Sequence, residues 1–163
     1  MIILGIDPGL AIMGYGVIEV KNYQVKTIDY GAIYTPSKTP ISDRLQIIYD
    51  GLTQLFEKFK PDKVAFEELF FNTNTTTAIN VAQARGVAIL VANQHTNNIL
   101  EFTPLQIKQA LTGNGRAEKK QVQYMVKQIL NLKEIPKPDD AADALAVAIC
   151  LSQTNTLLGN YKM

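Results

Sequence analysis

The chain has 163 residues, of which 47% are hydrophobic and 19% are charged, and its formal net charge is +1. This size and composition predict one soluble globular domain over residues 1–163 and leave no room for a second catalytic domain. The longest apolar run is far too short to span a bilayer, and no basic segment precedes the apolar N-terminus. We therefore expect a cytoplasmic protein that does not enter a membrane.

The first predicted strand ends in an acidic residue. Residues 1–6 form an apolar run typical of a buried strand, and Pro8-Gly9 ends that strand directly after Asp7. The carboxylate therefore stands at the C-terminal end of a strand. An Asp-Pro-Gly sequence is also a common turn, so Asp7 taken singly has a purely local explanation.

An antiparallel meander and a helix follow the first strand. The segments 14–20 and 25–34 have the composition of strands, and the polar turn 21–23 joins them. Across 41–59 the apolar residues step by threes and fours. That spacing predicts an amphipathic helix that packs on the sheet.

Glu67 repeats the arrangement of the first strand. It ends the short apolar run 63–66, and an Asn- and Thr-rich loop at 72–77 precedes a helix predicted over roughly 78–93. The apolar content of that helix is high enough for it to serve a subunit interface as well. The alternative for Glu67 is an exposed pair with Glu68 at the strand end.

Strand and helix then alternate towards the end of the chain. A short strand near 98–102 precedes Thr103-Pro104, a favourable helix start with Thr as the cap. The segment 112–116 separates that helix from another over about 117–130. This order predicts an α/β fold in which a five-stranded mixed sheet is flanked by helices.

The last predicted helix carries two acidic residues on one face. Asp140 and Asp143 are three residues apart at the start of the alanine-rich segment 140–149. Asp139 or Asp140 alternatively caps this helix after the prolines that precede it. Asp143 is harder to assign to a local role, because its neighbours are apolar on nearly every side and a charge there needs a partner or an ion.

Together, Asp7, Glu67, Asp140 and Asp143 predict a metal site. Carboxylates a few ångströms apart repel one another and raise each other's pKa, and a bound cation removes that penalty. Oxygen ligands without a neighbouring cysteine or histidine favour Mg²⁺ or Mn²⁺. Two such ions can activate water on one side of a phosphodiester and stabilise the leaving oxygen on the other, so the pattern favours phosphoryl-transfer chemistry.

The charged residues are unevenly distributed. The segment 108–137 carries seven Lys or Arg and two Glu, a net +5, which leaves −4 for the rest of the chain. A basic face beside an acidic pocket would attract polyanions, although a solvated helix surface explains the same lysines. Among other candidate nucleophiles, Cys150 is expected in the core, and His95 suits a surface or capping role.

Six short segments occur along the chain in a distinctive order and spacing. They are Ile6-Asp7-Pro8-Gly9, Gly14-Tyr15-Gly16, Glu67-Glu68-Leu69-Phe70, Gln83-Ala84-Arg85-Gly86-Val87-Ala88, Ala117-Glu118-Lys119 and Asp140-Ala141-Ala142-Asp143-Ala144-Leu145-Ala146. Together they resemble the RuvC family of Holliday-junction resolvases, in the ribonuclease H-like superfamily, over nearly the full length. The resemblance implies a ribonuclease H-like fold and an endonuclease that resolves four-way DNA junctions by paired symmetric nicks in recombination and repair.

The resemblance also implies roles for individual acids. Carried over by motif, Asp7, Glu67, Asp140 and Asp143 are the four catalytic acids, whereas Glu68 is not. As the ligands of two Mg²⁺ per subunit, with Mn²⁺ as a substitute, they would leave 5′-phosphate and 3′-hydroxyl ends. Asp139, directly before Asp140, adds a carboxylate that departs from the family pattern.

DNA contacts and partners are implied in the same way. Phe70 would insert into or stack on unpaired bases at the branch point, although a loop anchor tucked into the core is an alternative. Lys108 and Lys119 match family lysines near the site, where a cation positions a phosphate. The family further implies a homodimer and collaboration with a branch-migration helicase complex of the RuvA and RuvB type.

Three other functions account for part of the pattern. A ribonuclease H-like enzyme of the YqgF-like kind would cut structured RNA instead of a DNA junction. An actin-like or sugar-kinase domain also opens with a strand, an Asp and a glycine turn, but that fold needs two such halves and the chain has no second copy. A protein that binds junctions without cutting them would not need the four acids.

Overall fold

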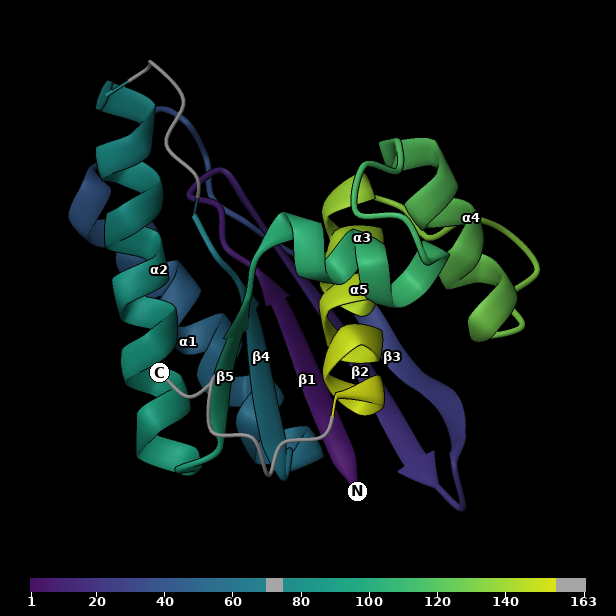
Figure 1. Cartoon of the computed structure of the whole chain (residues 1–163). Coiled ribbons are helices and arrows are strands. Elements are labelled where there is room, and N and C mark those ends of the chain that lie inside the picture. Colours follow the sequence, from purple (N-terminus) through teal and green to yellow (C-terminus); the bar gives the residue numbers. More distant parts are fainter. Residues whose placement is uncertain (70–74, 155–163) are drawn as a thin grey trace.

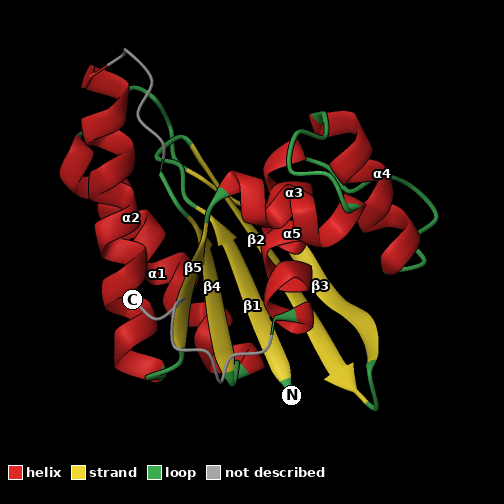
Figure 2. Cartoon of the chain, viewed as in Figure 1, coloured by secondary structure: helices red, strands yellow, loops and turns green. Residues whose placement is uncertain are grey.

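The computed structural model describes residues 1–69 and 75–154, which form one five-stranded sheet with helices on both faces (Figure 1, Figure 2). The first three strands pair antiparallel as a meander, and the last two run parallel to the first. Across the sheet the order is β3 (Gln24–Tyr34), β2 (Ile12–Lys21), β1 (Ile2–Asp7), β4 (Lys63–Glu67) and β5 (Ile99–Phe102). The mixed five-stranded sheet predicted from the sequence is confirmed.

The helices divide between the two faces of the sheet (Figure 1). On one face lie α1 (Ile41–Phe59) and α2 (Thr75–His95). The other face is covered by α3 (Pro104–Thr112), α4 (Lys119–Ile129) and α5 (Asp139–Gln153). Of these, α5 lies directly over β1 and β2, so the acids at its start are carried to the centre of the sheet.

Side chains alternate between two apolar layers along the strands. Ile3 on β1 and Ala65 on β4 pack in the layer with α3, α4 and α5. Leu4 and Val64 pack in the layer with α1 and α2. Because successive side chains of a strand point to opposite faces, the face on which each strand-end residue lies is determined by this alternation.

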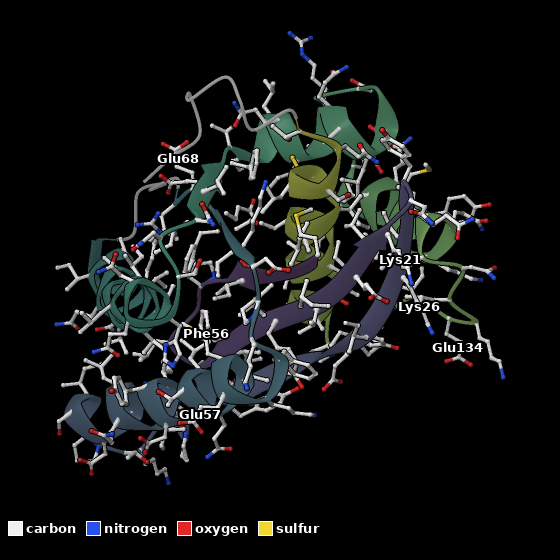
Figure 3. The ribbon with its side chains drawn as sticks, turned by 90° about the horizontal axis from the view of Figure 1, so that it is seen from below. Lys21, Lys26, Phe56, Glu57, Glu68 and Glu134 are labelled. Carbon is white, nitrogen blue, oxygen red and sulfur yellow. The ribbon has the colours of Figure 1, made fainter. Side chains whose placement is uncertain are left out.

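The apolar layer between α1 and the sheet contains an aromatic stack. Figure 3 shows Phe56 pointing from α1 towards the sheet, and its side chain is buried. His95 at the end of α2 stacks on Phe56 with the ring centroids 4.9 Å apart, and its Nδ1 lies 2.9 Å from the carbonyl oxygen of Val91. His95 is exposed, so the surface position predicted for it is confirmed.

Most predicted element boundaries agree with the structure. The helix predicted over 41–59 coincides with α1, and both strands of the meander agree to within two residues. The helix predicted from residue 78 begins earlier, at Thr75. Threonine has a modest intrinsic helix propensity, which is a weak preference that the surrounding structure readily overrides.

The two helix starts that the sequence analysis addressed behave differently. Thr103 caps α3 as predicted: its side chain accepts a hydrogen bond from the Gln106 backbone N–H, and the Gln106 side chain accepts one from the Thr103 N–H. Neither Asp139 nor Asp140 caps α5, because Pro138 occupies the N-cap and both acids lie in the first turn. The capping alternative is therefore wrong. Both acids instead lie in the first turn, where the positive end of the helix dipole stabilises a negative charge.

Cys150 is buried in α5, which confirms the core position predicted for it. Burial raises the pKa of its thiol to about 12, so the reactive thiolate is scarce at neutral pH. Among the described helices, none combines the length and apolar character needed to cross a membrane.

Candidate active site

Asp7 and Glu67 end two neighbouring parallel strands. β1 and β4 pair in parallel with Ile6 opposite Phe66, so the next residue on each strand is an acid. Asp7 lies four residues after Ile3 and Glu67 lies two residues after Ala65, and both of these residues pack on the α5 side. The strand pairing therefore brings two carboxylates from distant parts of the chain to one edge and one face of the sheet.

Three glycines allow α5 to lie directly on that face. A Cβ added to Gly5, Gly14 or Gly16 would overlap atoms of α5. At Gly14 the overlap would be with the carbonyl group of Asp140, and Gly14 itself is paired with Asp7 across the strands. The sequence contained a signal for this contact, because glycines two residues apart on a strand share one face and permit close approach of another backbone.

Asp143, one turn into α5, faces a pocket of about 240 Å³. The charged lining of this pocket consists of two predicted acids and both predicted lysines, namely Glu67, Asp143, Lys108 and Lys119. The remaining lining residues are largely apolar and come from α3, α4 and α5, namely Pro104, Ile107, Val122 and Ala146. Asp7 and Asp140 do not line this pocket.

Electrostatic effects nevertheless connect all four acids. Burial raises the pKa of Asp7 to about 8, with further contributions from the negative charges of Glu67, Asp143 and Asp140. Lys119 acts in the opposite direction. Because the charge of each of the other three carboxylates raises the pKa of Asp7, all three lie close enough to Asp7 for their charges to interact with it.

Glu67 and Asp143 are perturbed in the same sense. Burial, reinforced by the charge of Asp143, raises the pKa of Glu67 to about 7, while Lys119 and Lys108 oppose that rise. Burial also raises the pKa of Asp143 above its ordinary value, against the hydrogen bond from Lys119. Carboxyl groups whose pKa is raised by burial and by neighbouring carboxylates are typical of functional sites.

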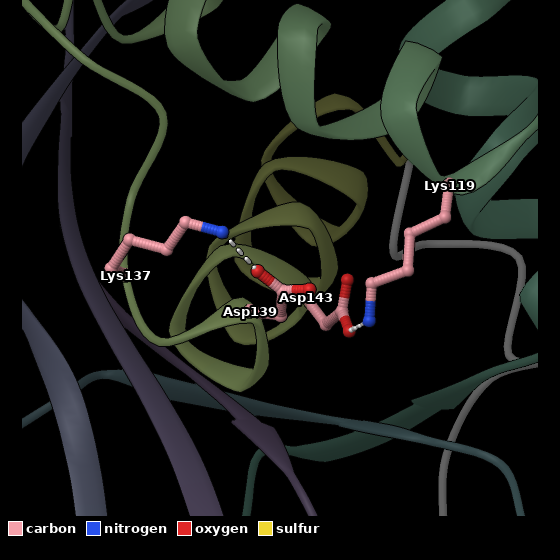
Figure 4. A network of polar contacts seen from close by, with 4 residues as sticks. All are labelled: Lys119, Lys137, Asp139 and Asp143. Carbon is pink, nitrogen blue, oxygen red and sulfur yellow. Dashed lines mark hydrogen bonds and ion pairs between the residues drawn. The ribbon is translucent and has the colours of Figure 1, made fainter.

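Lys119 supplies a positive charge at the edge of the pocket. Its Nζ donates to the carboxylate of Asp143 over 2.7 Å, as Figure 4 shows. Burial lowers the pKa of Lys119, but the hydrogen bond to Asp143 and the neighbouring acids outweigh that effect, so the pKa is raised. The ammonium group therefore remains charged and offsets part of the negative charge of the cluster.

The acids are suited to a hard divalent cation by their chemistry, because every charged donor is a carboxylate oxygen. Within residues 1–69 and 75–154, however, no three acidic, cysteine or histidine side chains are grouped closely enough to hold an ion in this structure. The carboxylate of Asp143 is paired with Lys119 instead. The four carboxylates are suitable ligands for such a cation and carry the negative charge that attracts it. In this structure the ammonium group of Lys119 supplies the positive charge beside Asp143.

Phe70 lies outside the described residues.

Two polar side chains were given no role by the sequence analysis, one on the α2 side of the sheet and one on α4. Arg85 on α2 forms an ion pair with Glu101 and lies 6.0 Å from the ring centroid of Phe66, beside the strand end that carries Glu67. Gln123 is buried on α4. A polar residue on the apolar stripe of a helix would have been the signal for Gln123.

Comparison with known proteins agrees along the whole chain. Residues 3–151 match the family model described as crossover junction endodeoxyribonuclease RuvC. The protein of that name from Alkaliphilus metalliredigens is 57% identical over 163 residues, which is 100% of this chain and 99% of the relative. The one from Clostridioides difficile is 56% identical over 157 residues, covering 96% of this chain and 93% of the relative.

A solved structure matches equally well. Thermus thermophilus RuvC in complex with Holliday junction substrate superimposes with a TM-score of 0.91 at 34% identity, covering 99% of this chain and 98% of that chain. The yeast mitochondrial Holliday junction resolvase shares the fold, with a TM-score of 0.68 at 15% identity over 92% of this chain and 78% of that one.

Proposed function

The chain belongs to the family of crossover junction endodeoxyribonuclease RuvC, and from this premise we propose that its carboxylate pocket is the place where a four-way DNA junction is cut. The protein is a Holliday junction resolvase with the ribonuclease H-like fold of that family, acting in recombination and DNA repair. The observation that carries the site assignment is the convergence of Glu67, Asp143, Lys108 and Lys119 on one pocket.

We propose two Mg²⁺ ions per subunit as the cofactor, with Mn²⁺ as a substitute. Asp7, Glu67, Asp140 and Asp143 would hold them. Among these four acids, Asp7 has the carboxyl group whose pKa is raised by the charges of all three others. When bound, such ions supply an activated water and stabilise the leaving oxygen of a phosphodiester.

The two pocket lysines are proposed to hold the phosphate that is cut. Lys108 and Lys119 line the same pocket as Glu67 and Asp143, so a phosphate between them would meet cations on the side away from the sheet. Apolar side chains of α3 and α4 line the pocket beside these charges, and a less polar surrounding strengthens each of the charge interactions.

Direct hydrolysis is the reaction that these residues support. It leaves a 5′-phosphate and a 3′-hydroxyl and requires no covalent enzyme intermediate. The thiol of Cys150 is buried with its pKa raised to about 12, and His95 stacks on Phe56 on the opposite side of the sheet. Neither residue is placed to act as a nucleophile.

A homodimer would bring two such pockets to one junction, so that opposite strands receive paired nicks. Two-fold symmetry of the protein suits a two-fold substrate. The proposed interface is the outer face of α2, where Ile79 and Leu90 are 60% and 54% exposed. Gly86 lies on the same helix and a Cβ there would meet nothing within 4 Å, which leaves space for a second chain.

Several further assignments are proposed on family membership alone. Phe70 would stack on unpaired bases at the branch point. A branch-migration helicase complex of the RuvA and RuvB type would be the protein partner, and the cytoplasm would be the location.

The decisive experiment uses a synthetic four-way junction labelled on each strand in turn, incubated with and without Mg²⁺. We expect nicks at symmetric positions on opposite strands, in the presence of Mg²⁺, with ligatable 5′-phosphate ends. The Asp7→Asn variant should bind the junction in Ca²⁺ but cut none of it, since phosphate contacts and catalysis are separate functions.

Two control results would contradict the proposal. Structured RNA of similar size is the first control substrate, and cutting it in preference to the junction would favour a ribonuclease. Tight junction binding without cleavage in either Mg²⁺ or Mn²⁺ would instead indicate a junction-binding protein.

A further inference from the structure

The turn that follows Asp7 is tightly closed and packed against the sheet. It comprises residues 8–11, between the end of β1 and the start of β2. A Cβ added to Gly9 would lie 2.1 Å from the carbonyl oxygen of Ile12, so a side chain at Gly9 has no room. Leu10 is buried in the apolar layer that contains α1 and α2. Buried backbone groups need hydrogen-bond partners, and the carbonyl groups of this turn find theirs in a distant segment.

Thr35, directly after β3, supplies those partners. Its backbone N–H donates to the carbonyl oxygen of Ala11 over 3.0 Å, and its hydroxyl donates to the carbonyl oxygen of Leu10. One residue therefore binds two successive carbonyl groups of the turn. The bond to Ala11 continues the pairing of β2 with β3, in which Ile12 lies opposite Tyr34. The bond to Leu10 depends on the Thr35 side chain.

Arg44, near the start of α1, completes this set of contacts. Its Nε donates to Oγ1 of Thr35 over 2.8 Å, so the hydroxyl accepts one hydrogen bond and donates another. Thr35 is 6% exposed, and a hydroxyl buried to this extent is costly unless it is bonded. Because a guanidinium group has no acceptor, the hydroxyl proton cannot point to Arg44 and is left for the Leu10 carbonyl oxygen.

The strand pairing alone supports Asp7 on one side. Asp7 lies opposite Gly14 on β2, whereas the register of β1 with β4 ends one residue earlier, at Ile6. Beyond Asp7 the backbone leaves the strand and enters the turn 8–11. The ligands of a metal ion must be held within about 0.5 Å of their productive positions. The turn is therefore the second support of the Asp7 backbone, and Thr35 and Arg44 hold the turn.

We propose that Thr35 and Arg44 are positioning residues, which hold the turn 8–11 and thereby fix the strand end that presents Asp7 to a divalent cation. Arg44 acts from the α1 side of the sheet, opposite the face that α5 covers. Both residues act through the backbone of the turn. The importance of this support for cleavage rests on the proposed function of the acids.

The first test needs neither metal nor DNA. Hydrogen exchange of the peptide that covers residues 8–14, whose sequence is the same in every variant, measures how often the turn opens. Thr35→Val removes the hydroxyl and should speed this exchange about tenfold, as the loss of one hydrogen bond does. Thr35→Ser retains a hydroxyl and should exchange much as the unaltered protein does. Equal exchange in Thr35→Val and the unaltered protein would overturn the proposal.

Thr53→Val is the matched control for that measurement. The hydroxyl of Thr53, on α1, donates to the carbonyl oxygen of Tyr49 over 2.8 Å, so the same chemical change removes a hydrogen bond elsewhere. Exchange of the peptide 8–14 should not change. A rise equal to that in Thr35→Val would mean that any loss of stability opens the turn, and would overturn the proposal.

Variants of Arg44 test whether the two residues act as one unit. Arg44→Met leaves the buried hydroxyl in place and should speed the exchange less than Thr35→Val does. The double variant should exchange no faster than Thr35→Val, because Arg44 acts through the hydroxyl that is already lost. Additive effects would overturn the proposed unit. If Thr35→Val does not fold, Arg44→Met decides the question, and unchanged exchange in that variant would overturn the proposal.

The second test concerns the metal. Thr35→Val should raise the Mg²⁺ concentration for half-maximal junction cleavage about tenfold, as the loss of a group that orients a metal ligand does. The junction Kd in Ca²⁺ should stay close to that of the unaltered protein, because DNA contacts are separate from ligation. Thr35→Ser should restore the original Mg²⁺ requirement. A fall in Tm and kcat at an unchanged Mg²⁺ requirement would mean a structural role only, and would overturn the proposal.

The Asp7→Asn variant separates this proposal from the proposed function. If Asp7→Asn cuts junctions as fast as the unaltered protein, the proposed metal site is wrong and the role of Thr35 towards a metal fails with it. The exchange measurement then still shows whether Thr35 holds the turn. If Asp7→Asn is inactive but Thr35→Val needs no more Mg²⁺ than the unaltered protein, the site stands and the positioning role of Thr35 is wrong.

Discussion

Gly14 on β2 and Asp140 at the start of α5 are packed backbone against backbone, and a Cβ on Gly14 would overlap the Asp140 carbonyl group. Gly14 is also the residue paired with Asp7 on the neighbouring strand. The first turn of α5 therefore reaches the strand end that carries Asp7 because this position has no side chain. Backbone packing, more than side-chain reach, sets the relative positions of these acids.

The Gly14→Ala variant should displace the start of α5 from the sheet. We expect a loss of about 1–3 kcal/mol in the free energy of unfolding, as for other overpacked sites, together with loss of junction cleavage because Asp140 and Asp143 move away from Asp7. Urea unfolding and a cleavage assay measure the two effects. Gly115→Ala is the control for stability, since its Cβ would meet the exposed side chain of Leu105 at 3.0 Å and the Leu105 carbonyl oxygen at the ordinary contact distance of 3.5 Å. Full activity of Gly14→Ala would contradict this account of the site.

The metal-free protein should lose stability as the pH rises. The pKa of Asp7 is raised from 3.8 to about 8 and that of Glu67 from 4.5 to about 7, so the folded state retains protons that the unfolded chain releases. The free energy of unfolding should therefore fall between about pH 4 and about pH 8. At about 1.4 kcal/mol per pKa unit, the part due to Asp7 is on the order of 6 kcal/mol.

Urea unfolding in EDTA at about pH 5 and about pH 8 checks this dependence. Asp7→Asn should be more stable than the unaltered protein at the higher pH and should differ little from it at the lower one, because only the ionised carboxylate is destabilising. A stability difference between the two proteins that is the same at both pH values would count against the burial of an ionisable Asp7.

Removing the Lys119 ammonium group should impair cleavage more than binding. We expect Lys119→Ala to lower kcat about tenfold or more, since a cation at the reacting phosphate is lost. The junction Kd should change by less than about threefold, because a single phosphate contact contributes a small share of DNA affinity. Lys120→Ala, at the exposed neighbouring position, is the matched control. Equal losses in cleavage and binding for Lys119→Ala would indicate a simple docking contact.

The outer face of α2 should determine the oligomeric state. Leu90→Glu places a charge on the proposed interface and should weaken the dimer by about 100-fold or more. Analytical ultracentrifugation across a range of concentrations measures this change. Leu105→Glu is the matched control, because Leu105 is an equally exposed leucine on α3, at 61% exposure. A dimer that survives Leu90→Glu unchanged would place the interface elsewhere.

Phe70 remains a prediction from the sequence, and its role can be tested by substrate choice. Phe70→Ala should slow the cutting of an intact junction more than the cutting of a pre-nicked, flexible one, since stacking is needed only where bases must be held unpaired. Single-turnover rates on the two substrates provide the measurement. If both rates fall by the same factor, Phe70 does not act at the branch point.

Much of the fold and two of the strand-end acids could be predicted because the controlling forces are local. The apolar periodicity across 41–59 and the capping residues at Thr103 depend on neighbours a few residues away, and both were predicted correctly. The capping alternative for Asp139 was wrong because Pro138 already occupies that position. Local patterns alone could not decide whether Pro138 or Asp139 would occupy the N-cap position of α5.

The sequence by itself determined that Asp7 and Glu67 end buried strands, because alternation along a strand and a following turn are written in adjacent residues. Only the tertiary structure decided that Asp143 would be paired with Lys119, 24 residues earlier in the chain, and that the Nε2 of Gln123 would be buried with no hydrogen-bond partner in the part of the chain that the structure describes. Those contacts arise where α4 packs against α5. The orientation of two packed helices depends on side chains from the whole molecule, so no local segment specifies it.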